Sequence, residues 1–291
     1  MPQSTRRQFR ETLKPGAAML LPGVANALAA RIVADQGFDA AYITGAGIAN
    51  TYLGIPDNGL VTLSELVDHV TTIRDVFPKP LMVDADTGFG NALNMRRTVQ
   101  VLERAGADAI QIEDQVFPKR CGHFEGKQVV PSSEMVAKIK AAADARTDAD
   151  LMIVARTDAI AVEGFNAAMD RIHAFREAGA DVGFVEAPTN PEQIATIARL
   201  PFPQLINIVV GGKTPEIPND ELKKLGFAGV LYANTALQAA VLGMQRALSH
   251  LKTHGQMGDG AGMLVSFKER QRLVNIQSFQ DMERRYSPDK Q

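Results

Sequence analysis

The chain has 291 residues, 45% of them hydrophobic, which is enough apolar material for one large α/β domain or two smaller ones. Its 31 Lys and Arg nearly balance its 33 Asp and Glu, which argues against a nucleic-acid partner or a membrane surface. One cysteine excludes an intrachain disulfide, and no run of about 18 apolar residues is present that could span a membrane. The N-terminus lacks the apolar segment of a secretory signal. We therefore expect a globular, cytoplasmic protein.

Short apolar runs that predict buried strands alternate with segments of helical spacing. Asn26 begins one helix as an N-cap, and Thr62 with Glu65 predicts a capping box at another. The expected helices, in chain order, cover 5–14, 26–36, 62–76, 92–105, 133–145, 164–178, 191–198 and 219–225. The expected strands cover 17–21, 40–43, 81–84, 109–112, 151–155, 182–185, 205–209 and 229–232, the first of them closed by Pro22 and Gly23.

The alternation predicts the fold. Eight strands of continuous apolar character, each followed by a helix, predict a closed (β/α)8 TIM barrel. A doubly wound open sheet is the alternative, weakened because no Gly-x-Gly-x-x-Gly follows the first strand. Glycine just past a helix end is the usual left-handed C-cap, and it recurs before several strands, at Gly37, Gly106, Gly179 and Gly226.

The C-terminal part exceeds what a barrel needs. Helical patterns cover 235–253 and 267–283, although a barrel requires only one helix after its eighth strand. We therefore expect a single barrel domain over 1–291, with 235–291 as a C-terminal helical extension. The surplus helices pack either on a partner subunit or as a lid on their own barrel.

Polar side chains follow the ends of the predicted strands, where (β/α)8 barrels carry their working site. Asp84, Asp86 and Glu113 form the clearest carboxylate cluster, on neighbouring strands. Such hard oxygen ligands suit Mg²⁺ or Mn²⁺, whereas zinc would need His or Cys ligands that these strands lack. The other strand ends expected at the same mouth are Thr44, Gly45, Ala46, Arg156, Glu186 and Asn207.

The only cysteine, Cys121, lies in a segment with Lys119, Arg120, Gly122 and His123. Most free cysteines are buried and inert, but this composition is that of a loop. The neighbouring cations favour the thiolate and so make the proton easier to give away. We expect this loop, with the flexibility that Gly122 allows, to close over a bound substrate and Cys121 to act as a general acid.

The sequence over 112–116 and 118–123 resembles the characteristic loop of the isocitrate lyase/phosphoenolpyruvate mutase superfamily. Further motifs match in the same order, so the resemblance covers nearly the whole chain, and within the superfamily the chain is most similar to the short-chain lyases. These motifs lie at 45–47, 53–57, 83–88, 155–159 and 185–188.

The resemblance implies a lyase that cleaves a substituted malate or isocitrate-like 2-hydroxydicarboxylate, of the 2,3-dimethylmalate or 2-methylisocitrate type. The products are pyruvate or another 2-oxo acid and a carboxylic acid. It implies Mg²⁺ (or Mn²⁺) bound by Asp86, with Asp84 and Glu113 acting largely through water. Tyr42 is the candidate base for the 2-hydroxyl proton, and Cys121 protonates the departing carbanion. Lys119, His123 and Arg156 complete the catalytic set, and the substrate-binding set is Thr44, Gly45, Ala46, Asp57, Gly122, Arg156, Glu186 and Asn207.

The resemblance also implies a homotetramer, a dimer of dimers in which the last helix is exchanged between subunits. Other readings stay open: an oxaloacetate hydrolase or decarboxylase, a phosphonomutase of the carboxyvinyl-carboxyphosphonate type, and a barrel that only binds an oxo acid. Ala233 stands near the position where the hydrolases carry a serine, and the phosphonomutases lack the cysteine. The sequence over 209–212 departs from the one associated with 2-methylisocitrate cleavage, which disfavours that substrate.

Overall fold

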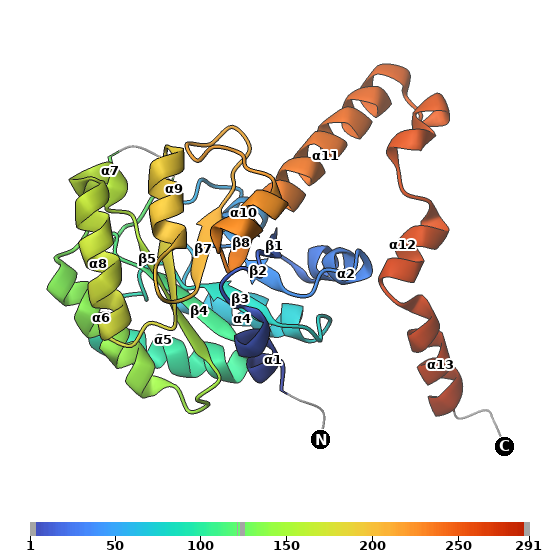
Figure 1. Ribbon diagram of the computed structural model, residues 1–291. Helices are drawn as coiled ribbons and strands as arrows, with labels where there is room; N and C mark the ends of the chain where they lie inside the picture. Colours follow the sequence, from blue (N-terminus) through green and yellow to red (C-terminus); the bar gives the residue numbers. More distant parts are fainter. Residues whose placement is uncertain (1–3, 121, 123–125, 288–291) are drawn as a thin grey trace.

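The computed structural model describes residues 4–120, 122 and 126–287. Its centre is a closed barrel of parallel strands, each paired with its neighbours in sequence and the first paired with the last (Figure 1). The predicted TIM barrel is confirmed, and the open-sheet alternative is wrong. The strands are β1 (Met19–Val24), β2 (Ala41–Ile43), β3 (Leu81–Asp84), β4 (Ala109–Glu113), β5 (Met152–Thr157), β6 (Val182–Val185), β7 (Gln204–Asn207) and β8 (Gly229–Tyr232).

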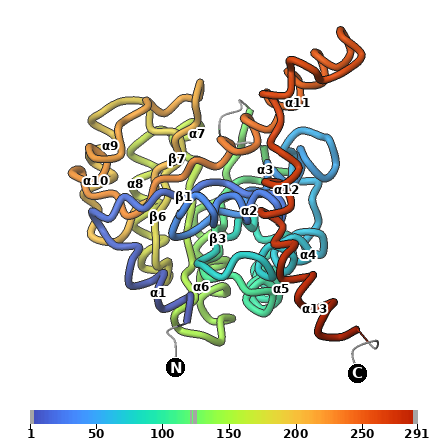
Figure 2. Tube along the Cα trace, turned by 90° about the vertical axis from the view of Figure 1, so that its right-hand side faces the viewer, coloured from blue at the N-terminus to red at the C-terminus, as the bar shows by residue number. Residues whose placement is uncertain are grey.

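Helices between the strands cover the outside of the barrel (Figures 1 and 2). The predicted caps are present: Asn26 Oδ1 accepts a hydrogen bond from Ala29 N at 2.9 Å, and Thr62 and Glu65 form a capping box. The outer helices are α2 (Ala27–Asp35), α4 (Leu63–Arg74), α5 (Ala92–Ala105), α6 (Ser132–Ala145), α8 (Phe165–Glu177), α9 (Pro191–Ala198) and α10 (Asn219–Leu225), with the short α7 (Ile160–Glu163) before α8.

Two stretches next to the barrel mouth differ from the predictions. β1 continues through Pro22 and Gly23, which were expected to close it, because a Cβ at Gly23 would collide with the backbone of Ala233 and glycine alone allows that approach. The small-residue loop expected after β2 is a short helix, α3 (Gly45–Ile48), followed by the π-helix η1 (Ala49–Leu53). Thr44 caps α3 by accepting a hydrogen bond from Gly47 N at 3.2 Å.

The first helix, α1 (Thr5–Thr12), closes the N-terminal end of the barrel. Its Phe9 is fully buried and lies in one apolar cluster with the inward-facing side chains of the strands, among them Leu21, Met152 and Leu205. The alternate strand residues, such as Ile110, face outward and pack against the helices in a second cluster. The strands are therefore buried on both faces, as their continuous apolar runs predict.

The C-terminal arm extends beyond the barrel. α11 (Thr235–His254) projects from it with η2 (Gly258–Met263) at its far end, and α12 (Phe267–Leu273), which contacts α2, and α13 (Ile276–Tyr286) run back along the side of the barrel (Figures 1 and 2). The single helix expected over 267–283 is two helices, because Asn275 adopts a left-handed φ of 59°. Arg272 ties the arm to the barrel through Asp35, with both hydrogen bonds at 2.7 Å.

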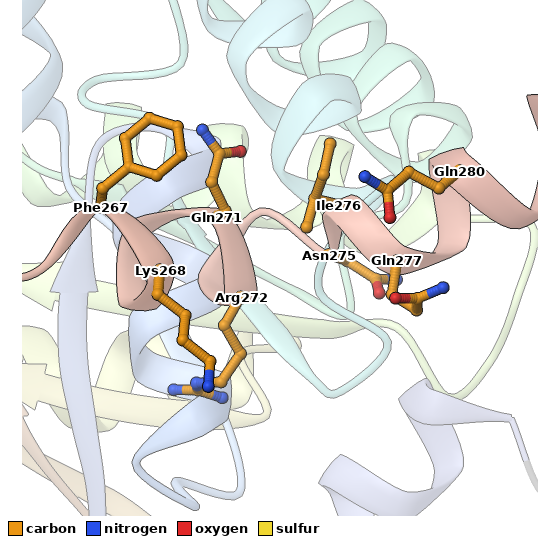
Figure 3. A pocket seen from close by; sticks show the side chains of 8 residues that line it. All are labelled: Phe267, Lys268, Gln271, Arg272, Asn275, Ile276, Gln277 and Gln280. Carbon is orange, nitrogen blue, oxygen red and sulfur yellow. The ribbon is translucent and has the colours of Figure 1, made fainter.

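An open groove of about 660 Å³ runs along the arm (Figure 3). It lies beside α12 and α13, far from the strand ends, so it is a surface of the arm and not part of the barrel mouth. The groove is lined by Phe267, Lys268, Gln271, Arg272, Asn275, Ile276, Gln277 and Gln280.

Within the described residues, no helix combines the length and apolarity needed to cross a membrane.

Candidate active site

Two carboxylates at the end of β3 converge on the backbone of α3. Asp84 is the last residue of β3, and Asp86 follows it with a left-handed φ of 49°. Asp84 accepts hydrogen bonds from Asp86 N at 3.2 Å and from Gly45 N at 3.3 Å. A Cβ on Gly45 would lie 3.1 Å from Asp86 Oδ1 and 3.2 Å from Asp84 Oδ2. The glycine therefore allows the backbone to lie against both carboxylates.

Arg156 joins the ends of β4, β5 and β6. It lies opposite Glu113 in the β4–β5 register, with Nη1 3.3 Å from Glu113 Oε2. Its Nε and Nη2 donate to Asp158 at 2.9 and 3.0 Å, and its Nε lies 3.8 Å from Glu186 Oε2. Burial lowers the pKa of Arg156, but the charges of Asp158 and Glu113 raise it more, so the guanidinium stays charged.

Lys119 lies within the acidic cluster. Its side chain is only 3% exposed, and its Nζ is 2.6 Å from Asp57 Oδ1 and 2.9 Å from Asp86 Oδ1. Burial raises the pKa of Asp86, the charge of Lys119 lowers it and that of Asp84 raises it again, leaving it at about 7. Burial also raises the pKa of Glu113 well above its usual value, against the charge of Arg156. The mouth thus carries more buried carboxylates than its cations neutralise.

Tyr42 is tied to the acidic cluster through Gln111, a residue that the sequence analysis did not select. The Tyr42 hydroxyl donates to Gln111 Oε1 at 2.5 Å, and Gln111 Nε2 donates to Asp84 Oδ1 at 3.2 Å. Burial, and then the charge of Asp84, raises the pKa of Tyr42 well above 10. A polar residue in the middle of the apolar run over 109–112 was the available signal for Gln111.

A further buried carboxylate, Asp114, holds the ends of β4 and β5 together without facing the mouth. It accepts hydrogen bonds from Thr157 Oγ1 at 2.7 Å and from Asp158 N at 2.9 Å, and it pairs with Arg171 at 3.2 Å. Burial, and then the charge of Asp158, raises the pKa of Asp114 to about 6. Its sequence position next to Glu113 does not distinguish this structural role from a ligand role.

The strand ends enclose a small cavity of about 40 Å³. Ten of the site residues predicted from the sequence line it: Tyr42, Thr44, Ala46, Asp57, Asp84, Lys119, Gly122, Arg156, Glu186 and Asn207. Gly45, Asp86 and Glu113 lie directly behind this lining, through the contacts given above. Cys121 and His123 fall outside the described residues. The residues not selected from the sequence are Arg120, Phe184, Val209, Ala233 and Asn234.

Several polar atoms at the mouth have no hydrogen-bond partner within the described part of the chain. Asp86 Oδ1 and Glu113 Oε1 are buried without one, although Lys119 lies close enough to Asp86 for an ion pair. The side-chain Oδ1 atoms of Asn207 and Asn234 are buried and unsatisfied in the same way. Because buried polar atoms are normally paired, these atoms indicate where a cation and a polar ligand fit.

The donor set fits a hard divalent cation. Within the described ranges, no group of three His, Cys, Asp or Glu side chains is arranged to coordinate an ion directly. Mg²⁺ keeps several waters and usually takes only one or two protein carboxylates, so Asp86 with water-mediated contacts from Asp84 and Glu113 suits it. Its charge would also stabilise the ionised forms of Asp86 and Glu113, whose pKa values burial raises.

Fold and site together define a (β/α)8 barrel whose mouth gathers buried carboxylates around Lys119 and Arg156. The family model described as phosphoenolpyruvate phosphomutase matches residues 9–252. The chain therefore belongs to this family, within the PEP mutase/isocitrate lyase superfamily.

Named relatives and solved structures span nearly the whole chain. A 2,3-dimethylmalate lyase of Eubacterium barkeri is 39% identical, covering 98% of this chain and 99% of the relative. A 2-methylisocitrate lyase of Aeropyrum pernix is 42% identical, covering 95% and 88%. A crystal structure of 2,3-dimethylmalate lyase superposes with a TM-score of 0.92 at 34% identity, over 99% of this chain and 97% of the other. A phosphonopyruvate hydrolase complex with oxalate and Mg²⁺ gives 0.88 at 28% identity, over 98% and 99%.

Proposed function

We propose that the protein is a Mg²⁺-dependent lyase that cleaves the C2–C3 bond of a substituted malate to a 2-oxo acid and a carboxylic acid. The observation that carries the proposal is the meeting of Asp84, Asp86 and Glu113 with Arg156 at one barrel mouth, where two buried carboxylate oxygens lack hydrogen-bond partners among the described residues. The two lyase relatives described above support the reaction class.

Arg156 and the divalent cation would both stabilise negative charge on the substrate. When bound, Mg²⁺ supplies a positive charge that stabilises an oxyanion on the substrate. Arg156 is buried, fixed by Asp158 and kept charged, so it can hold a substrate oxygen without reorganising during the reaction. The solved neighbour with oxalate and Mg²⁺ supports the binding of a small carboxylate anion together with the metal.

Tyr42 is proposed to accept the proton of the substrate 2-hydroxyl. A neutral phenol cannot accept a second proton, so the base is the Tyr42 phenolate, and the hydrogen that the hydroxyl donates to Gln111 must be lost to solvent before turnover. Burial, and then the charge of Asp84, raises the pKa of Tyr42 and disfavours the phenolate, so a nearby positive charge is needed for Tyr42 to ionise. We therefore expect no turnover without the divalent cation.

Cys121 is proposed to protonate the carbanion left by C2–C3 cleavage, as the loop composition indicates. Its replacement by serine or alanine is expected to lower kcat by at least about a hundredfold, because general acids contribute about 10²–10⁴ in rate. Calorimetric titration with Mg²⁺ and pyruvate should still show binding. Full turnover in either variant would remove Cys121 from the mechanism.

The apolar part of the cavity supports a small substituent on the substrate. Phe184, Val209 and Ala233 contribute to the lining, and Phe184 also lies under the Arg156 guanidinium, 5.3 Å from its ring centre. Methyl groups fit such surfaces, whereas a third carboxylate would lose its hydration there. We therefore propose 2,3-dimethylmalate-type substrates ahead of 2-methylisocitrate.

An activity screen with Mg²⁺ tests the proposed function. The substrates are 2,3-dimethylmalate, 2-methylisocitrate, oxaloacetate and phosphonopyruvate. Release of the 2-oxo acid from the first two is followed with a coupled dehydrogenase, and consumption of the last two is measured directly. The expected result is the highest kcat/KM with 2,3-dimethylmalate. Turnover of oxaloacetate or phosphonopyruvate in the absence of malate cleavage would replace the proposal by a hydrolase or mutase function, and binding without any turnover would favour the non-enzymatic reading.

The C-terminal arm is proposed to pack on a second copy of the chain in a homotetramer. None of the described residues of α11, α12 and α13 is buried, although they carry large apolar side chains such as Leu248, Phe267 and Phe279 at 63, 71 and 54% exposure. Exposed apolar surface of this extent marks an interface. Light scattering should give four times the chain mass of 31.4 kDa, and Phe279→Glu should lower it; a monomeric wild type would contradict the proposal.

A further inference from the structure

Two buried side chains hold the backbone on both sides of position 121. Before it, Gln115 makes two hydrogen bonds to the backbone of Arg120: its Oε1 accepts from the N–H at 2.9 Å, and its Nε2 donates to the carbonyl at 2.8 Å. After it, Lys127 Nζ donates to the carbonyl of Gly122. Gln115 is 1% exposed and the Lys127 side chain 2%, so water does not compete for these bonds.

Both side chains start from a fixed base. Gln115 follows β4 and forms an antiparallel bridge with Val129. Backbone hydrogen bonds of 2.8 Å flank this bridge, from Val116 N to Gln128 O and from Val130 N to Asp114 O. The two ends of the loop that follows β4 are therefore joined next to the barrel, and the side chains of Gln115 and Lys127 add further hydrogen bonds closer to the mouth.

Lys127 connects the loop to the substrate-binding arginine. Its Nζ lies 2.8 Å from Asp158 Oδ1, and Asp158 is the carboxylate that holds Arg156 through two hydrogen bonds. Gly122 packs against Arg156 so closely that a Cβ would collide with the guanidinium. Asp158 thus holds both the guanidinium of Arg156 and the ammonium of Lys127, which in turn binds the loop carbonyl of Gly122. Hydrogen bonds of this kind, with an ionised partner, are about twice as strong as neutral ones.

We propose that Lys127 and Gln115 are positioning residues for catalysis, which hold the backbone of Gly122 and Arg120, the neighbours of Cys121 in sequence, at the barrel mouth. The kinetic consequence rests on the proposed lyase function, whereas the anchoring itself does not. Lys127 has the larger effect, because it carries a charge and its removal leaves both Asp158 and the buried carbonyl of Gly122 without this partner.

The test is Lys127→Met, which keeps the aliphatic stem and removes the ammonium. Cys121 is the only thiol of the chain, so its rate of alkylation by iodoacetamide reports on the loop without requiring activity. The matched control is Lys79→Met: Lys79 Nζ also donates to a backbone carbonyl, that of Phe38, but it lies before β3 at the opposite end of the barrel. Lys127→Arg serves as the conservative variant.

Lys127→Met is expected to alkylate at least about fivefold faster than the wild type and to lose about a hundredfold in kcat/KM, mainly through kcat, as for a misplacement of about 1 Å. Lys127→Arg should recover part of both, and Lys79→Met should change neither. Alkylation and kcat equal to the wild type in Lys127→Met would overturn the proposal. So would an equal effect in Lys79→Met, because it would show a general loss of stability.

Gln115→Met keeps the test available if Lys127→Met does not fold. It removes a neutral amide, so it should accelerate alkylation and lower kcat, each by a smaller factor than Lys127→Met does. An unchanged alkylation rate in Gln115→Met would overturn the positioning role proposed for Gln115. If the wild type cleaves no malate at all, the lyase function fails, but the alkylation comparison still decides whether the two side chains anchor the loop.

Discussion

Replacing Gly122 by alanine tests whether the loop works in the position that the structure shows. A Cβ built on Gly122 lies 2.9 Å from both Cγ and Cδ of Glu186, and closer still to Nη2 of Arg156. Carbon atoms prefer separations of about 3.5–4.0 Å, so the loop must lift by roughly 0.5–1 Å or displace both side chains. Arg156 cannot yield easily, because Asp158 holds it through two hydrogen bonds. The loop backbone is therefore the part that moves.

The expected loss follows from that displacement. A misplacement of about 1 Å at a reacting group costs about a hundredfold in rate, or about 2.7 kcal/mol of transition-state stabilisation. The free energy of unfolding should change by less than about 1 kcal/mol, because the loop can lift without opening the core. Gly122→Ala should thus lower kcat/KM strongly while leaving the urea midpoint nearly unchanged.

Steady-state kinetics with 2,3-dimethylmalate and Mg²⁺ measure the first quantity, and urea unfolding followed by circular dichroism measures the second. Gly243→Ala in α11 is the matched control, since a Cβ there meets nothing within 4 Å. It should leave kcat/KM unchanged. A kcat/KM for Gly122→Ala within about threefold of the wild type would show that turnover does not use this loop position, and the reasoning would then be refuted.

Three further predictions concern the barrel base, the buried ion pairs and the metal. Phe9→Ala should lower the free energy of unfolding by about 3–5 kcal/mol, because it removes a buried ring from the apolar cluster inside the barrel. A loss below about 1 kcal/mol in urea unfolding would contradict this role. Burial raises the pKa of Asp158, but the charges of Arg156 and Lys127 lower it more, to about 2 from 3.8. Its charged form therefore stabilises the fold above about pH 4, and this contribution is lost as the pH falls towards 2. Asp158→Asn should lose about 2 kcal/mol or more at pH 7, and its deficit against the wild type should narrow below pH 4; a deficit independent of pH would contradict the assignment. Asp86→Asn should abolish the calorimetric signal of Mg²⁺ binding, and an unchanged affinity would place the metal elsewhere.

The sequence by itself determined the barrel and the position of its mouth. Period and capping decide where strands and helices lie, and these are local properties, as the capping box at Thr62 and the glycine at the end of α5 illustrate. Parallel strands in a closed barrel necessarily bring their carboxyl ends together. Polar residues at those ends, such as Asp84 and Arg156, had to meet once the strands were correctly placed.

The tertiary structure decided which of the polar residues hold one another, because partners far apart in sequence meet only through strand register and loop path. Lys119 pairs with Asp57, 62 positions earlier, and Gln111 links Tyr42 to Asp84 across three strands. No periodicity encodes such pairs. The same holds for Lys127: its sequence position shows only a cation near the end of a loop, and its role as an anchor follows from a contact with Asp158 at the end of another strand.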